Sequence, residues 1–121
     1  MTSVLLAVED DPDFQVLIRA ALSQEADLQV AEEMPSTVDR AIQVTERVHP
    51  QLIILDHNLE GELVGLSAAP RLKEAAPDAK ILLFTAYDLA REARTEPAID
   101  AYVRKDDVQS LVPTARRLLG L

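Results

Sequence analysis

The stretch Pro50-Gln-Leu-Ile-Ile-Leu-Asp-His-Asn-Leu-Glu-Gly61 decides the fold of this 121-residue chain. Residues 52–55 are consecutive branched apolar residues, which predicts a strand buried on both faces, as in a parallel sheet. Asp56 follows directly, so an ionisable carboxylate stands at the carboxyl end of that strand. Open α/β sheets place their ligand sites at this end of their strands. The stretch therefore predicts a parallel sheet and also the place of its functional site.

A second acidic group follows another apolar strand. Glu9 and Asp10 come directly after the run from Val4 to Val8. If this strand is the neighbour of the one that ends at Asp56, three carboxylates meet at one point. They would repel one another unless a cation or a shared proton held them together. We interpret this arrangement as the strongest indication of function in the chain.

Composition limits the class of protein. The length suits one domain, which we expect to cover residues 1–121. Aromatic residues make up 3%, so the core is aliphatic, and the absence of cysteine excludes a disulfide framework and a thiolate metal site. The net charge of −9 argues against a nucleic-acid backbone as a direct partner. No apolar run approaches the ~18 residues of a membrane span and no signal peptide is visible, so we expect a cytoplasmic protein that contacts no membrane.

Apolar runs alternate with amphipathic stretches along the whole chain. We expect strands near 3–8, 27–32, 51–55, 79–84 and 98–103, and helices over 12–24, from Ser36 to before Pro50, over 67–75 and from about Ser110. Between residues 88 and 95 we expect only a short or irregular fourth helix, because Glu96-Pro97 ends it. Ser36 is the expected N-cap of the second helix, and Pro70 is expected within the first turn of the third. The alternation predicts a doubly wound sandwich with the parallel strand order 2-1-3-4-5.

In that order the carboxyl ends of strands one, three, four and five surround one pocket. Besides the three carboxylates they bring Thr85 and Lys105 there. Magnesium prefers oxygen ligands, and an aspartate can act as a nucleophile toward phosphorus. An ammonium and a hydroxyl would then bind the phosphoryl oxygens, and the small side chain of Ala86 would leave room for the group. Each residue alone is more often structural, but their combination favours phosphoryl transfer.

Four segments together resemble the motifs of two-component response-regulator receiver domains, which have the CheY-like, flavodoxin-like (βα)5 fold. The resemblance covers essentially the whole chain and rests on these segments: Val8-Glu9-Asp10-Asp11-Pro12, Leu55-Asp56-His57-Asn58-Leu59, Phe84-Thr85-Ala86 and Tyr102-Val103-Arg104-Lys105. It implies that Asp56 is the phosphoacceptor for a histidine kinase or phosphotransfer protein. It implies that Glu9, Asp10, Asp56 and the main-chain carbonyl of Asn58 hold Mg2+.

The resemblance also implies roles for the surrounding residues. Thr85, Ala86 and Lys105 would bind the phosphoryl group. Tyr102 would turn inward when the Thr85 hydroxyl moves to the phosphate, and Asn58 and Tyr87 would tune the lifetime of the phosphoryl bond. The chain departs from the usual pattern at two positions near Asp56: His57 stands where an apolar residue is usual, and Glu60 where a proline is frequent.

A receiver of this kind would signal by contact with an unidentified downstream protein. We expect no turnover of an external substrate, no direct nucleic-acid contact, and a monomer or weak homodimer. A stand-alone single-domain regulator is the preferred interpretation, and a piece of a longer regulator is the alternative. The main competing function is a phosphate-independent interaction module with the receiver fold. A phosphatase is disfavoured because the Asp-x-Asp pair after the first strand is missing, and a flavin carrier because the first loop is acidic.

Overall fold

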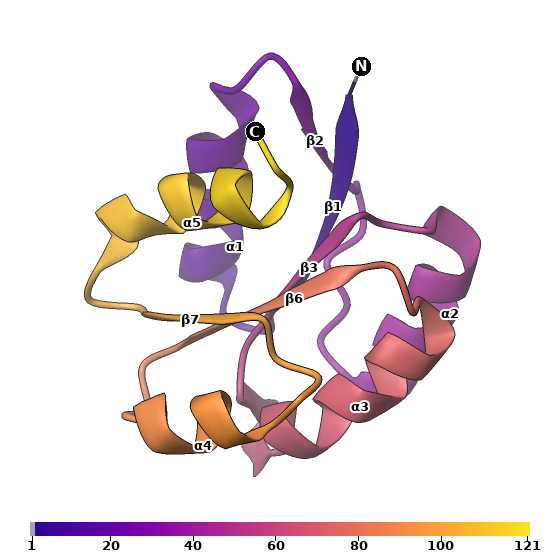
Figure 1. Cartoon of the computed structure of the whole chain (residues 1–121), viewed down its shortest axis with the longest axis vertical. Helices are drawn as coiled ribbons and strands as arrows, with labels where there is room; N and C mark the ends of the chain where they lie inside the picture. Colours follow the sequence, from indigo (N-terminus) through magenta and orange to yellow (C-terminus); the bar gives the residue numbers. More distant parts are fainter. Residues whose placement is uncertain (1) are drawn as a thin grey trace.

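A parallel sheet with the strand order β2-β1-β3-β6-β7 forms the centre of the computed structural model, which describes residues 2–121 (Figure 1). All four neighbouring pairs are parallel. The predicted order 2-1-3-4-5 is confirmed, because β6 and β7 are the fourth and fifth strands expected. The sheet consists of β1 (Ser3–Val8), β2 (Leu28–Val30), β3 (Leu52–Leu55), β6 (Lys80–Thr85) and β7 (Ala101–Arg104).

Helices cover both faces of this sheet (Figure 1). Successive strand residues point to opposite faces, so each strand contributes to two apolar cores. One core contains Leu5, Ile54 and Phe84, and the other contains Ile53 and Leu83. The first core is covered by α1 (Pro12–Ser23) and α5 (Leu111–Leu118), the second by α2 (Val38–Val48), α3 (Gly65–Ala75) and α4 (Ala90–Thr95).

The short fourth helix and the late start of the last helix are confirmed. Helix α4 has 6 residues and ends before Glu96-Pro97. A 3-10 turn, η1 (Val108–Ser110), precedes α5, so Pro113 falls in the first turn of α5. Strand β2 is shorter than the expected 27–32, and β7 begins at Ala101 rather than at residue 98.

The expected N-cap of the second helix was wrong. Thr37, not Ser36, is the N-cap of α2, and its side chain accepts the N–H of Arg40. Both residues carry a hydroxyl, and the cap falls on Thr37 because its extended backbone lies directly before the first turn. The Ser36 hydroxyl instead donates to Glu60 Oε2 at 2.8 Å.

The expected position of Pro70 was also wrong. Helix α3 begins at Gly65, two residues earlier than predicted, so Pro70 lies beyond the first turn. Pro70 is on the exposed side of the helix, where its ring does not disturb the core. The helix starts early because its first N–H groups find acceptors outside the helix.

An unpredicted antiparallel hairpin follows Asp56. It consists of β4 (Asn58–Leu59) and β5 (Glu62–Leu63). Its two-residue turn places Glu60 at φ 53° and Gly61 at φ 83°, the pair of positive values that a type I′ turn requires. The hairpin therefore lies directly between β3 and α3, next to the expected site.

Candidate functional site

The carboxyl ends of β1 and β3 bring three acidic side chains together. The Asp56 N–H donates to the Val8 carbonyl at 3.1 Å, which fixes the two strand ends side by side. One carboxylate oxygen from each of Glu9, Asp10 and Asp56 lies within 4.8 Å of the other two. Glu9 and Asp56 are buried and Asp10 is half-buried. The structure thus gathers the three carboxylates, as the sequence predicts.

Lys105 extends from the end of β7 into the same site. Its backbone N–H donates to the Thr85 carbonyl at 2.9 Å, which continues the pairing of β6 with β7 by one residue. Its Nζ lies 2.9 Å from Glu9 Oε1 and 2.8 Å from Asp56 Oδ2. The side chain is 8% exposed, so this ammonium bridges two buried carboxylates.

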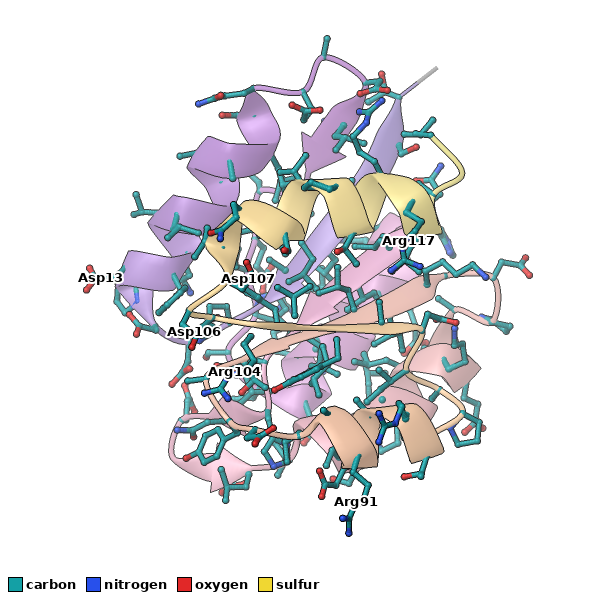
Figure 2. The ribbon with its side chains drawn as sticks, turned by 60° about the vertical axis from the view of Figure 1, so that its left-hand side comes forward. Asp13, Arg91, Arg104, Asp106, Asp107 and Arg117 are labelled. Carbon is teal, nitrogen blue, oxygen red and sulfur yellow. The ribbon has the colours of Figure 1, made fainter. Side chains whose placement is uncertain are left out.

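Phe14 of α1 contacts the Lys105 ammonium. The Nζ atom lies 4.2 Å from the centroid of the Phe14 ring, within cation–π range. Helical spacing predicts which face of α1 Phe14 occupies but not which side chain it contacts. Arg104 and Asp106, on either side of Lys105, are exposed and pair with each other at 3.6 Å (Figure 2).

Burial dominates the electrostatics of the cluster. Glu9 is 1% exposed, and desolvation raises its pKa to about 7 from the ordinary 4.5; the hydrogen bond from Lys105 opposes this rise and the Asp56 charge adds to it. Burial acts to lower the pKa of Lys105, but hydrogen bonds to Asp56 and Glu9 outweigh it and leave that pKa raised. Lys105 therefore stays charged. The cluster therefore holds three carboxylates and one ammonium, and this charge balance favours the binding of a further cation.

A hydroxyl and a small residue form the opposite wall. Thr85 is fully buried, and its Oγ1 accepts the N–H of Tyr87 at 3.4 Å. Ala86 follows Thr85 and is exposed. A cavity of about 250 Å³ lies between these residues and the acidic cluster. Its lining includes Asp10, Asp56, Asn58, Thr85, Ala86, Tyr87 and Lys105.

Tyr102 of β7 connects its strand to the loop after β6. Its hydroxyl donates to the Tyr87 carbonyl at 2.7 Å and accepts the Leu89 N–H at 3.2 Å. The loop that these bonds hold begins at Thr85. Tyr102 and Thr85 are therefore mechanically connected, while the concerted movement expected of them stays a prediction.

The hairpin turn holds Asp10. The Glu60 N–H donates to Asp10 Oδ2 at 2.9 Å, and the Glu60 carboxylate accepts the Ser36 hydroxyl. A proline at position 60 could not make the first of these bonds, because it has no N–H. The departure from the usual pattern at Glu60 therefore gives Asp10 a donor from the hairpin.

The donor set fits a small hard cation. Glu9, Asp10 and Asp56 present carboxylate oxygens to one point. Asn58 lines the adjoining cavity, and its side-chain Oδ1 is buried without a hydrogen-bond partner among the described residues. Mg2+ takes oxygen ligands, keeps several waters and needs only one or two carboxylates. These residues could therefore hold Mg2+, while the predicted use of the Asn58 main-chain carbonyl stays a prediction.

His57 has contacts that sequence analysis did not foresee. Its N–H donates to Asp56 Oδ1 at 2.7 Å. Its ring is buried, meets the Tyr87 ring edge-on at 5.8 Å between centroids, and accepts the Leu66 N–H on Nδ1 at 3.2 Å. Burial lowers the pKa of His57, and the Asp56 charge only partly opposes this, so the ring is neutral at pH 7. The feature of the sequence that could have indicated a special role for this residue is a histidine at a position where an apolar residue is usual.

A doubly wound sheet with an acid cluster, a buried lysine and a threonine hydroxyl at its switch point indicates the class of receiver domains. The chain belongs to this class: the family model described as "Response regulator receiver domain" matches residues 5–115. Receiver domains are signalling modules that bind Mg2+ at an acidic pocket and interact with histidine kinases or phosphotransfer proteins.

Two curated relatives illustrate the family. The nitrate/nitrite response regulator protein NarL of Escherichia coli K12 is 26% identical over 106 residues, covering 86% of this chain and 48% of NarL. The response regulator protein VraR of Staphylococcus aureus Mu3 is 28% identical over 107 residues, covering 87% of this chain and 50% of VraR. The chain thus spans about half the length of the curated relatives it matches.

Solved structures agree with this assignment. The response regulator TrrA of Thermotoga maritima, in complex with Mg(2+)-BeF, is 28% identical with a TM-score of 0.78, covering 97% of this chain and 99% of that one. A LuxR-family response regulator from Aurantimonas sp. SI85-9A1 has a TM-score of 0.85 at 22% identity, covering 99% of this chain and 87% of that one, which shows a shared fold. Within residues 2–121, every helix is too short or too polar to cross a membrane.

Proposed function

We propose that this chain is a phosphorylation-dependent receiver in which Asp56 accepts a phosphoryl group from a histidine kinase or a phosphotransfer protein. One observation carries the proposal. The buried Asp56 carboxylate lies 2.8 Å from the Lys105 ammonium and lines the same cavity as the Thr85 hydroxyl. A nucleophile, a cation and a hydroxyl thus share one small space, as in-line phosphoryl transfer requires.

The two oxygens of Asp56 have different partners. The His57 N–H holds Oδ1, while Oδ2 faces Lys105. In the proposed step Oδ2 forms a bond to phosphorus as the phosphorus–nitrogen bond of a phosphohistidine breaks, and the electron pair leaves with the nitrogen. Lys105 and Thr85 bind the phosphoryl oxygens, and Ala86 leaves space for them.

Four residues are proposed to hold Mg2+: Glu9, Asp10, Asp56 and Asn58, the last through its main-chain carbonyl. The bound ion would neutralise the charge of the phosphoryl oxygens. The hairpin orients Asp10 through the Glu60 N–H and carries Asn58 in its first strand. Glu9 and Asp56 both bind the Lys105 ammonium. Once a bound ion compensates the charge of these two carboxylates, the ammonium would be free to move toward the phosphoryl group.

The proposed output is a change in the loop after β6. Thr85 moves toward the phosphoryl group, and Tyr102 turns into the space it leaves. The hydrogen bonds of the Tyr102 hydroxyl to this loop support a coupling of the two movements. Asn58 and Tyr87 both line the cavity and would control the approach of the hydrolytic water, and so the lifetime of the phosphoryl bond.

The downstream partner is proposed to be a protein. The net charge of −9 disfavours direct contact with nucleic acid, and we expect a monomer or a weak homodimer. NarL and VraR are response regulators about twice as long as this chain. The parts of NarL and VraR outside the matched region do not indicate which protein this receiver would regulate.

Phosphotransfer from acetyl phosphate with Mg2+ tests the proposal. Intact-mass measurement should show one added phosphoryl group on the wild type, none on Asp56→Asn, and normal addition on Asp78→Asn. Asp78 is a suitable control because it is exposed and precedes β6, at the opposite end of the sheet. A folded wild type without the added group, or a modified Asp56→Asn protein, would contradict the proposal; the first result would favour the phosphate-independent interaction module.

A further inference from the structure

We propose that His57 is a positioning residue of the phosphoacceptor site: with its carbonyl and its imidazole it caps the first turn of α3, and so fixes the peptide that holds Asp56 Oδ1. The catalytic consequence of this inference rests on the proposed phosphorylation of Asp56. The cap itself depends only on the contacts described below.

Three successive N–H groups at the start of α3, those of Val64, Gly65 and Leu66, donate to His57. A helix leaves its first N–H groups without intrahelical acceptors, and a Ser, Thr, Asp or Asn side chain usually accepts one of them. Val64, at the N-cap position of α3, makes no such side-chain bond. Instead the N–H groups of Val64 and Gly65 donate to the His57 carbonyl at 2.9 and 3.0 Å, and the Leu66 N–H donates to His57 Nδ1 at 3.2 Å. One residue outside the helix thus satisfies three successive donors.

This cap requires a side chain with an acceptor at position 57. Because Nδ1 accepts, the proton of the neutral ring is assigned to Nε2. An apolar side chain would keep the two bonds to the main-chain carbonyl but would leave the half-buried Leu66 N–H without its partner. An unpaired buried donor is costly, so the start of α3 would shift or fray.

The start of α3 is also pressed directly against the phosphoacceptor peptide. A Cβ atom on Gly65 would lie 2.4 Å from His57 Cα and 2.6 Å from the Asp56 carbonyl oxygen, so no other residue fits there without movement of the backbone. The peptide in question joins Asp56 to His57, and its N–H is the donor to Asp56 Oδ1 at 2.7 Å. A shift of α3 would therefore rotate the group that orients the carboxylate.

The ring of His57 has a second partner across the site. It meets the Tyr87 ring at 5.8 Å between centroids with an interplanar angle of 81°. Tyr87 lines the cavity beside Asp56, and its carbonyl accepts the Tyr102 hydroxyl. The imidazole therefore lies between the helix start and the aromatic wall of the cavity, and its two contacts can be separated by substitution.

Two variants separate these contacts. Asparagine places its Oδ1 where histidine has Nδ1, so His57→Asn keeps an acceptor for Leu66 and loses the part of the ring that meets Tyr87. Glutamine carries its oxygen one bond further out, so His57→Gln loses the Leu66 bond. His57→Leu removes both contacts. His49→Asn is the matched control, because His49 is an exposed residue at the C-cap of α2, where its φ of 53° also suits asparagine.

The measurements are the rate of phosphorylation by acetyl phosphate at saturating Mg2+, the dephosphorylation rate, and the hydrogen exchange of the Leu66 amide, each on protein whose circular dichroism matches the wild type. With His57→Gln or His57→Leu we expect exchange of Leu66 to accelerate on the order of tenfold and phosphorylation to slow about tenfold. His57→Asn should restore both to within about threefold of the wild type while changing the dephosphorylation rate. His49→Asn should match the wild type in all three.

Two results would overturn the inference. One is wild-type phosphorylation and exchange rates in His57→Gln, and the other is a His57→Asn protein as slow as His57→Gln. If His57→Leu does not fold, the comparison of asparagine with glutamine still decides. A folded wild type that accepts no phosphoryl group would refute the proposed function instead, and the exchange of Leu66 in the same variants would then still test the cap.

Discussion

Replacing Glu9 with glutamine is expected to stabilise the metal-free protein above neutral pH, although it removes a proposed metal ligand. Burial raises the pKa of Glu9 to about 7 in the folded chain, against an ordinary value of 4.5. The folded state therefore holds a proton over a pH range in which the unfolded chain has released it. The stability that Glu9 contributes is complete below about pH 4.5 and is lost as the pH rises to about 7.

The size of the effect follows from the same values. A pKa rise from 4.5 to about 7 corresponds to about 3 kcal/mol of penalty on the ionised form at pH 8. Glutamine resembles the protonated acid and avoids this penalty, but it has one acceptor oxygen where Glu9 uses two, for Lys105 and for the Asp11 N–H. Losing one of those bonds costs about 1 kcal/mol, so the expected net gain is about 2 kcal/mol at pH 8 and much less at pH 5.

Urea unfolding followed by circular dichroism at pH 5 and pH 8, with EDTA present, measures this gain. Glu74→Gln is the matched control, because Glu74 is exposed on α3 and its replacement changes the net charge equally. Removing any one negative charge reduces the repulsion within a chain of net charge −9. The Glu74→Gln variant measures the stability gained in this way, which is then subtracted from the gain of Glu9→Gln. The reasoning is refuted if Glu9→Gln is no more stable than the wild type at pH 8, if its advantage is the same at pH 5, or if Glu74→Gln matches it.

Three further predictions follow from the site and its surroundings. Mg2+ should raise the thermal unfolding midpoint of the wild type and EDTA should reverse the rise, whereas Asp10→Asn should lose most of it; an undiminished response in that variant would contradict the ligand assignment. Gly61→Ala should cost about 1 kcal/mol of unfolding free energy, because its φ is 83° and open space surrounds it. Gly65→Ala should cost clearly more, through its contact with the backbone, and equal urea midpoints would refute this. Tyr87→Ala should change the hydrolysis rate of the aspartyl phosphate, measured by the loss of the added mass, and an unaltered rate would exclude a role in the lifetime.

The sequence predicts the place of the site because strand ends are a topological property. Four apolar residues before Asp56 indicate a central parallel strand, and the strand order then puts Glu9, Thr85 and Lys105 at the same edge of the sheet. No side-chain geometry is needed for that step. The same reasoning predicts the short fourth helix, since Pro97 ends any helix before it.

The parts that the sequence did not predict depend on contacts between distant segments. The N-cap on Thr37, the early start of α3 and the hairpin are decided by which donors find acceptors nearby. Phe14 has the spacing of any core residue, and only the folded chain places it beside Lys105. His57 looked like a departure from the usual pattern, and its cap on α3 becomes visible only when the helix start lies against it.

A structure determined with Mg2+ and beryllofluoride tests the central claim most directly, namely that four strand ends form one site for a cation and a phosphoryl group. We predict beryllofluoride on Asp56, in contact with the Lys105 ammonium and the Thr85 hydroxyl, and Mg2+ beside Glu9 and Asp10. Beryllofluoride missing from Asp56 at saturating concentration, or Mg2+ bound away from these carboxylates, would contradict the account.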